Sequence, residues 1–115
     1  MRISLRPLAA ADVDAMLAWR YDPPYDMYDH DADPSDVELM RAAVVSGEGW
    51  YAADDIETGE LVGFFEFVGA ADEIDVGLGL RPDLTGRGLG AGFLRQGLSF
   101  ARDRWSPVSF ALDVF

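Results

Sequence analysis

A glycine-rich turn between a strand pattern and a helix pattern limits how this chain can fold more than any other feature. The segment covers residues 78–92 and reads LGLRPDLTGRGLGAG. Such a turn exposes backbone N–H groups at the beginning of a helix, where the helix dipole favours an anion. Backbone without side chains also lets a phosphate group approach closely. The segment therefore predicts a site for a nucleotide-type ligand.

Apolar periodicity in the rest of the chain predicts an α/β fold with a mixed sheet. The expected strands are residues 2–8, 50–54, 61–68, 73–80 and 108–114, and the expected helices are residues 9–20, 35–46 and 93–101. The three middle strands form an antiparallel meander, and the final strand–helix–strand unit requires a right-handed crossover to a parallel strand. At this length we expect a single domain spanning residues 1–115.

The second expected helix carries signals at both ends. Residues 35–38 (SDVE) match a capping box that begins at Ser35, with Pro34 directly before it. Gly47 is a residue type that readily ends a helix. We therefore expect Ser35 to cap the helix.

The fourth expected strand alternates between two kinds of position. Its apolar positions are Ile74, Val76, Leu78 and Leu80, and its other positions are Glu73, Asp75, Gly77 and Gly79. Gly77 and Gly79 leave part of the second face without side-chain bulk. We expect an extended ligand to lie there.

The net charge of −12 excludes some classes of partner. Nucleic-acid binding requires Lys and Arg side chains that neutralise phosphates, so no nucleic-acid partner is expected. No apolar run reaches the roughly 18 residues of a membrane span, and no cysteine is present for disulfides or metal thiolates. The acidic cluster from Asp22 to Asp36 lacks the spacing of a calcium loop, so no metal is expected. We expect a cytoplasmic protein.

Three interpretations of the glycine turn compete. In the first interpretation the turn holds no ligand; this leaves Gly92 and Gly97 unexplained, and these two residues suggest close helix–sheet packing. In the second interpretation the turn binds a dinucleotide, because residues 86–91 fit a relaxed G-x-G-x-x-G/A pattern. That interpretation requires a tighter turn than residues 82–85 allow, and more βαβ units than the chain supplies.

The third interpretation is a family resemblance. The sequence Leu80-Arg-Pro-Asp, followed by Thr85-Gly-Arg-Gly-Leu-Gly90 and a helix, resembles the acyl-coenzyme A motif of the GNAT superfamily of acetyltransferases. The order of expected elements also matches that fold along the whole chain. The resemblance implies an enzyme that transfers acetyl from its cosubstrate acetyl-CoA to an amine of a small molecule or protein. A non-catalytic acyl-CoA-binding or interaction module of the same fold is the alternative.

The resemblance assigns the cosubstrate site residue by residue. The strand before the motif pairs with the pantetheine arm, and Leu78, Gly79 and Leu80 hold those positions. The N–H groups of the turn hold the pyrophosphate, at positions occupied by Gly86, Arg87, Gly88, Leu89, Gly90 and Ala91. Thr85 departs from the family pattern, which has Gln or Arg there, so we expect weaker binding that Arg87 or Arg81 supports.

Members of the superfamily also continue beyond the position of Phe115 into a helix and two strands. Those elements supply a frequent general-acid tyrosine and one wall of the acceptor site. We therefore expect a domain that is incomplete at its C-terminus. The apolar residues Val108, Phe110 and Leu112 would then be exposed, and a homodimer is a possible consequence.

Acetyl transfer to an amine requires a base, a polarised carbonyl and a proton for the leaving thiolate. The candidate bases are Glu73, Asp75 and Glu66, each of which is otherwise a solvated strand carboxylate. A backbone N–H near Leu78 is the candidate donor to the carbonyl oxygen. His30, the one histidine, lies in the acidic segment and is expected to be a surface residue.

The segment from Trp19 to Tyr28 resembles the loop that covers the acceptor pocket in this superfamily. Its aromatic residues and aspartates suit a cationic amine, and the candidate contacts are Trp19, Tyr25 and Tyr28. The alternative is a packed loop with a solvated acidic edge.

Overall fold

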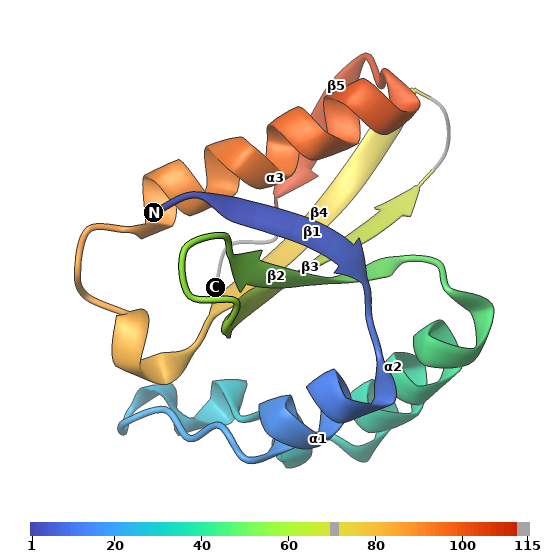
Figure 1. The fold of residues 1–115 in the computed structure, drawn as a ribbon. Helices are drawn as coiled ribbons and strands as arrows, with labels where there is room; N and C mark the ends of the chain where they lie inside the picture. The colour runs from blue at the N-terminus through green and yellow to red at the C-terminus, as the bar shows by residue number, and fades with distance from the viewer. Residues whose placement is uncertain (70–71, 113–115) are drawn as a thin grey trace.

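A five-stranded mixed sheet separates two layers of helix (Figure 1). The computed structural model describes residues 1–69 and 72–112. The strands are β1 (Ile3–Pro7), β2 (Trp50–Asp55), β3 (Leu61–Gly69), β4 (Glu73–Leu80) and β5 (Ser109–Leu112), in the spatial order β1-β2-β3-β4-β5. β1 to β4 are antiparallel neighbours, and β5 is parallel to β4. The expected mixed α/β sheet is confirmed.

The helices lie on opposite faces of this sheet. They are α1 (Ala10–Leu17), α2 (Pro34–Ser46) and α3 (Gly90–Trp105), with short 3-10 turns η1 (Tyr25–Tyr28), η2 (His30–Ala32) and η3 (Pro82–Leu84). α1 and α2 pack on one face, and α3 crosses the other (Figure 1). α1 is shorter than the expected residues 9–20, since it ends at Leu17 with Ala18 as its C-cap. The expected continuation of the last strand past Leu112 lies outside the described residues.

The α3 face of the sheet holds the larger aromatic core. Phe65 is fully buried and stacks on Phe93 of α3, with ring centroids 4.6 Å apart. α3 approaches this closely because Gly97 has no side chain: a Cβ there would overlap the Phe65 ring. Gly97 is thus the packing position that its spacing predicts. The same expectation is wrong for Gly92, where a Cβ would meet open space.

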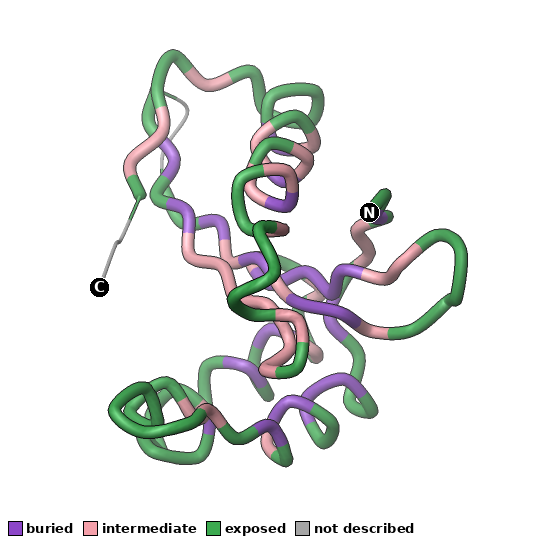
Figure 2. The backbone as a smooth tube through the Cα atoms, turned by 90° about the vertical axis from the view of Figure 1, so that its left-hand side faces the viewer, coloured by how far each residue is buried: buried purple, intermediate pink, exposed green. Residues whose placement is uncertain are grey.

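The opposite face holds a smaller core under α1 and α2. Val13, Met16 and Met40 are fully buried there, above the stacked rings of Trp50 and Phe64. Figure 2 shows that buried residues concentrate in the strands and along the inner sides of the helices. The beginning of α2 differs from expectation, since the cap is Asp33, whose carboxylate accepts from the Ser35 N–H at 2.9 Å. Pro34 occupies the first turn of the helix instead of preceding its cap.

An ion network joins β1, α1 and β2. The Arg6 guanidinium donates to both carboxylate oxygens of Asp12, at 2.7 and 2.9 Å, and to Asp54 at 2.7 Å. Asp12 also accepts from the Ala9 N–H at 2.7 Å. Burial raises the pKa of Asp12, but Arg6 and the Ala9 N–H lower it by more, so this pKa lies below its ordinary value.

Asp12→Asn is expected to lower the free energy of unfolding by about 1–3 kcal/mol at pH 7, because a neutral amide with one acceptor oxygen replaces the carboxylate that accepts from the Arg6 guanidinium and the Ala9 N–H. Because the pKa of Asp12 is lower in the folded than in the unfolded chain, its carboxylate contributes its full stabilisation above the unfolded pKa, at pH about 4. This contribution is lost as the pH falls through the folded pKa. Urea unfolding at pH 7 and pH 3 should therefore show a difference between variant and wild type that shrinks at the lower pH. Asp14→Asn, which breaks the exposed 3.1 Å pair with Arg41, should cost less than about 1 kcal/mol. An equal difference at both pH values would contradict this account of Asp12.

In the described part of the chain, no helix combines the length and apolar character needed to cross a membrane.

Candidate functional site

The outer edge of β4 changes character halfway along the strand. β5 pairs with β4 only from Glu73 to Val76 in the described residues. Since the Arg81 N–H donates to Val62 at 2.8 Å, the alternation of an antiparallel ladder turns the backbone groups of Leu78 and Leu80 away from β3. These two residues therefore present N–H and C=O groups at an edge where no described strand pairs with them.

Gly79, between them, differs from its assigned role. The same alternation directs its backbone groups to Phe64 of β3, so they belong to the sheet ladder and not to the edge. The expected bare face is also wrong at this position, because a Cβ on Gly79 would overlap the Phe64 ring. The Gly79 face is thus covered by Phe64, whereas Leu78 and Leu80 present backbone groups at the edge of β4.

The glycine turn follows directly and leads into α3. Gly86 and Gly88 have φ values of +73° and +74°, in the left-handed region that favours glycine. Within the described residues, the N–H groups of residues 86–92 have no hydrogen-bond acceptor, and no side chain caps α3. A Cβ on any glycine of this run would meet open space. Seven consecutive N–H groups without a described acceptor thus lie at the beginning of a 16-residue helix.

Charge around the turn is arranged for an anion. The first turn of α3 has no acidic residue, contrary to the usual preference, while Arg87 and Arg95 are exposed beside it. Thr85 donates its hydroxyl to the Pro82 carbonyl at 2.7 Å, so its side chain faces the preceding 3-10 turn.

Arg81 does not share the role expected for it. Its guanidinium donates to Asp83 at 2.6 Å and to the Leu61 carbonyl at 3.0 Å. Hydrogen bonding to Asp83 raises the pKa of Arg81 and lowers the pKa of Asp83. Arg81 therefore links η3 to β3, whereas Arg87 is exposed within the glycine turn.

Two of the three candidate bases share one face of the sheet near the middle of β4, and the third lies at the beginning of that strand. Glu66 and Asp75 occupy the same sheet face on neighbouring strands, and Glu66 leans over Gly77: a Cβ there would lie 3.6 Å from Glu66 Oε2. Glu73 lies at the beginning of β4, where it accepts from the Ser109 hydroxyl at 3.4 Å. Glu66 is thus the candidate nearest to the middle of β4.

The candidate acceptor contacts divide into buried and exposed residues. Trp19 is buried against His30, with ring centroids 5.8 Å apart, so it belongs to the core under α1 and α2. Tyr25 and Tyr28 lie one 3-10 turn apart in η1, with nearly parallel rings 6.5 Å apart and exposed fractions of 60% and 36%. Only the tyrosine pair is available to a ligand.

The expectation that His30 is a surface residue is wrong. It is buried between Trp19 and Phe64, with 9% of its surface exposed, and burial lowers its pKa despite the nearby Asp36, Asp29 and Asp31. Its Nε2 atom has no hydrogen-bond partner among the described residues. His30 is buried because it packs against the rings of Trp19 and Phe64. Its position in an acidic stretch of the sequence does not indicate this packing.

Tyr21 is a residue that the sequence analysis did not single out. Its hydroxyl donates to the Leu80 carbonyl at 2.7 Å, at the outer edge of β4. Burial, with a smaller effect of Asp29, raises the pKa of Tyr21 to about 12, so the hydroxyl remains a donor at neutral pH. The two partners are 59 positions apart in the sequence, so no local pattern indicates this contact.

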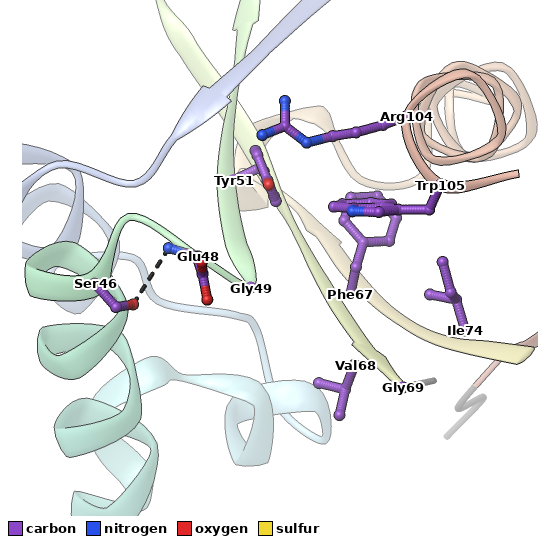
Figure 3. A pocket seen from close by; sticks show the side chains of 10 residues that line it. All are labelled: Ser46, Glu48, Gly49, Tyr51, Phe67, Val68, Gly69, Ile74, Arg104 and Trp105. Atoms are coloured by element: carbon purple, nitrogen blue, oxygen red, sulfur yellow. Dashed lines mark hydrogen bonds between the residues drawn. The ribbon is translucent and has the colours of Figure 1, made fainter. Parts of the chain in front are cut away.

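A separate pocket of about 720 Å³ opens at the far end of α3 (Figure 3). Tyr51, Phe67 and Trp105 form its apolar wall, and Arg104 lies over the rings of Tyr51 and Trp105. None of the candidate site residues lines this pocket. A smaller hollow of about 220 Å³ adjoins the glycine turn and is lined by Gly88, Leu89 and Ala91 among others.

No group of three or more His, Cys, Asp or Glu side chains suited to a metal ion occurs in residues 1–69 and 72–112.

Comparisons with known proteins agree with this architecture. A family model described as "Acetyltransferase (GNAT) domain" matches residues 2–111. A GNAT-family acetyltransferase from Bacillus anthracis has a similar structure, with 17% identity and a TM-score of 0.69 over 93% of this chain and 66% of that one. A spermidine N-acetyltransferase SpeG chimera from Vibrio cholerae and hSSAT gives 16% identity and a TM-score of 0.67, over 90% of this chain and 64% of that one.

A third similar structure is AAC(6')-Iy in complex with a bisubstrate analogue, CoA-S-monomethyl-acetylneamine. It has 10% identity and a TM-score of 0.59, over 100% of this chain and 81% of that one. No curated protein sequence matches the chain. The chain spans just under two thirds of the length of the first two structures, and at these identities the likeness concerns the fold.

Proposed function

This chain belongs to the acetyltransferase (GNAT) domain family, and from that premise we propose that it binds acetyl-CoA along β4 and transfers the acetyl group to an amine. The observation that carries the proposal is the run of N–H groups in residues 86–92 that have no acceptor among the described residues, directly beyond a part of β4 with which no described strand pairs. The pyrophosphate of the cosubstrate would accept hydrogen bonds from the N–H groups of residues 86–92, and the two amides of its pantetheine arm would pair with the edge of β4. Gly86, Arg87, Gly88, Leu89, Gly90 and Ala91 are the proposed pyrophosphate contacts.

The proposed chemistry is direct transfer. The amine nitrogen attacks the thioester carbonyl, a C–N bond forms, the C–S bond breaks, and coenzyme A leaves as a thiolate that takes up a proton. The Leu78 N–H, at the edge of β4 beyond its described pairing with β5, is the proposed donor to the carbonyl oxygen. Glu66 is the proposed acceptor of the amine proton, directly or through water, because it leans over Gly77 in the middle of β4. Asp75, on the same face, supplies further negative charge for a cationic amine.

Release of free thiol from acetyl-CoA in the presence of an amine panel tests this function. Spermidine begins the panel because one fold neighbour is named as a spermidine N-acetyltransferase. Thiol release that depends on an amine supports the enzyme. Saturable acetyl-CoA binding without thiol release for any amine would contradict catalysis and identify the alternative, an acyl-CoA-binding module.

Tyr25→Ala and Tyr28→Ala are each expected to raise the KM for a cationic amine by about 2- to 30-fold with kcat unchanged. A cation lying against exposed or partly desolvated rings gains about 0.5–2 kcal/mol, which the truncation removes. Steady-state kinetics at saturating acetyl-CoA measures this. Met27→Ala, which removes a 66% exposed side chain from the same turn, serves as the control and should leave KM unchanged. An unaltered KM in both tyrosine variants would remove η1 from the acceptor site.

A further inference from the structure

The contact between Tyr21 and β4 occupies the position that an extended ligand requires. The Tyr21 hydroxyl lies 2.7 Å from the Leu80 oxygen, and this oxygen points away from β3. A hydrogen-bond donor at a carbonyl lies near the plane of the C=O group and along its lone pairs. The hydroxyl therefore stands in the space that a ligand paired to this edge would enter, since paired strands lie about 4.8 Å apart.

Leu78 and Leu80 are the two positions whose backbone groups reach this edge, because residues two apart in a strand point the same way. A ligand N–H that pairs with this edge at Leu80 uses the Leu80 carbonyl as its acceptor. The Tyr21 hydroxyl satisfies that acceptor in the unliganded chain. One carbonyl thus has two competing donors at the same edge.

Tyr21 also belongs to a segment that is held together by internal hydrogen bonds. Its N–H donates to Asp29 Oδ1 at 2.8 Å, and the neighbouring Arg20 guanidinium contacts Asp31 at 2.6 Å. The segment between α1 and α2, residues 18–33, includes η1 and its exposed tyrosine pair. The Tyr21 hydroxyl consequently attaches the proposed acceptor segment to the proposed cosubstrate strand.

We propose that the Tyr21 hydroxyl competes with the pantetheine arm of acetyl-CoA for the Leu80 carbonyl, so that cosubstrate binding detaches residues 18–33 from β4. This inference rests on the proposed function, since it requires acetyl-CoA at that edge. In this scheme the acceptor segment becomes free to adjust around the amine when the Tyr21 contact is released. Tyr21 is a positioning residue in this scheme and takes no part in the chemical step.

Tyr21→Phe removes the competing donor and keeps the ring. The variant is expected to bind coenzyme A about 2- to 10-fold more tightly than wild type, the range that one net hydrogen bond supplies. Titration calorimetry with coenzyme A measures this affinity without any acetyl transfer. Tyr51→Phe is the matched control, because Tyr51 is a buried tyrosine in the core on the α3 side of the sheet, and its coenzyme A affinity should equal that of wild type.

Hydrogen exchange of residues 18–33 gives a second readout that needs no substitution. In wild type, coenzyme A should speed exchange in this segment, and in Tyr21→Phe exchange should be fast already without ligand. Equal or weaker affinity in Tyr21→Phe, or slower exchange of this segment in liganded wild type, would overturn the competition. Wild type that fails to bind coenzyme A would overturn the proposed function and this inference together, whereas binding that Tyr21→Phe leaves unchanged removes this inference alone.

Discussion

Gly88→Asp is expected to weaken acetyl-CoA binding by about 100-fold or more. Aspartate tolerates the left-handed conformation at φ +74° better than most residues, and its side chain meets open space, so the fold should persist. Its carboxylate would stand where the pyrophosphate is proposed to lie. Loss of two charge-assisted hydrogen bonds, at about 1.5–3 kcal/mol each, already exceeds two factors of ten.

Gly59→Asp is the matched control for this prediction. Gly59 has φ +75° and open space around its Cβ position, as Gly88 does, but it lies in the turn between β2 and β3. Both variants add the same charge and impose the same backbone conformation. Calorimetric titration should therefore find wild-type affinity in Gly59→Asp. Equal affinity in the Gly88 variant and this control would exclude the turn as the pyrophosphate site.

Phe65→Ala is expected to lower the free energy of unfolding by about 3–5 kcal/mol. Phe65 is fully buried, stacks on Phe93, and fills the space that Gly97 leaves under α3. Its loss leaves a cavity between β3 and the helix whose beginning forms the proposed pyrophosphate site. A domain of this size is typically stable by about 5–15 kcal/mol, so the variant approaches the limit of folding.

Urea unfolding measures the effect of Phe65→Ala. If the free energy of unfolding depends on urea concentration with the same slope as in wild type, the shift of the transition midpoint reports the loss of stability. Tyr25→Ala removes an aromatic ring of 60% exposure and should change stability by less than about 0.5 kcal/mol. That control also shows that the acceptor variant is folded. A loss below about 1 kcal/mol in Phe65→Ala would mean that α3 does not depend on this ring.

The periodic parts of the chain could be predicted from sequence because their signals are local. Alternation in β4 assigned Ile74 and Val76 to one face, and both are buried under α3. The spacing of Phe93 and Gly97 likewise predicted the inner side of α3. The direction of successive side chains repeats about every 2 residues in a strand and about every 3.6 residues in a helix because of backbone geometry alone. The sequence pattern therefore predicts which residues of an element face the core.

Three of the errors concern contacts between distant segments. Phe64 covers Gly79 because the register of β3 against β4 places them opposite each other, and no local pattern fixes that register. His30 is buried because Trp19 and Phe64 meet it from other elements. Arg81 donates to the Leu61 carbonyl of β3, 20 positions away, in addition to its near neighbour Asp83. Side chains with several available partners are assigned by tertiary structure, not by their neighbours in sequence.

The central claim is that the free N–H groups of residues 86–92 and the edge of β4 hold acetyl-CoA. Calorimetric titration of the wild-type chain with acetyl-CoA at two salt concentrations tests it most directly. We predict one saturable site whose affinity falls as salt rises, because part of the binding is charge on charge. The absence of any saturable heat up to millimolar acetyl-CoA would contradict the claim.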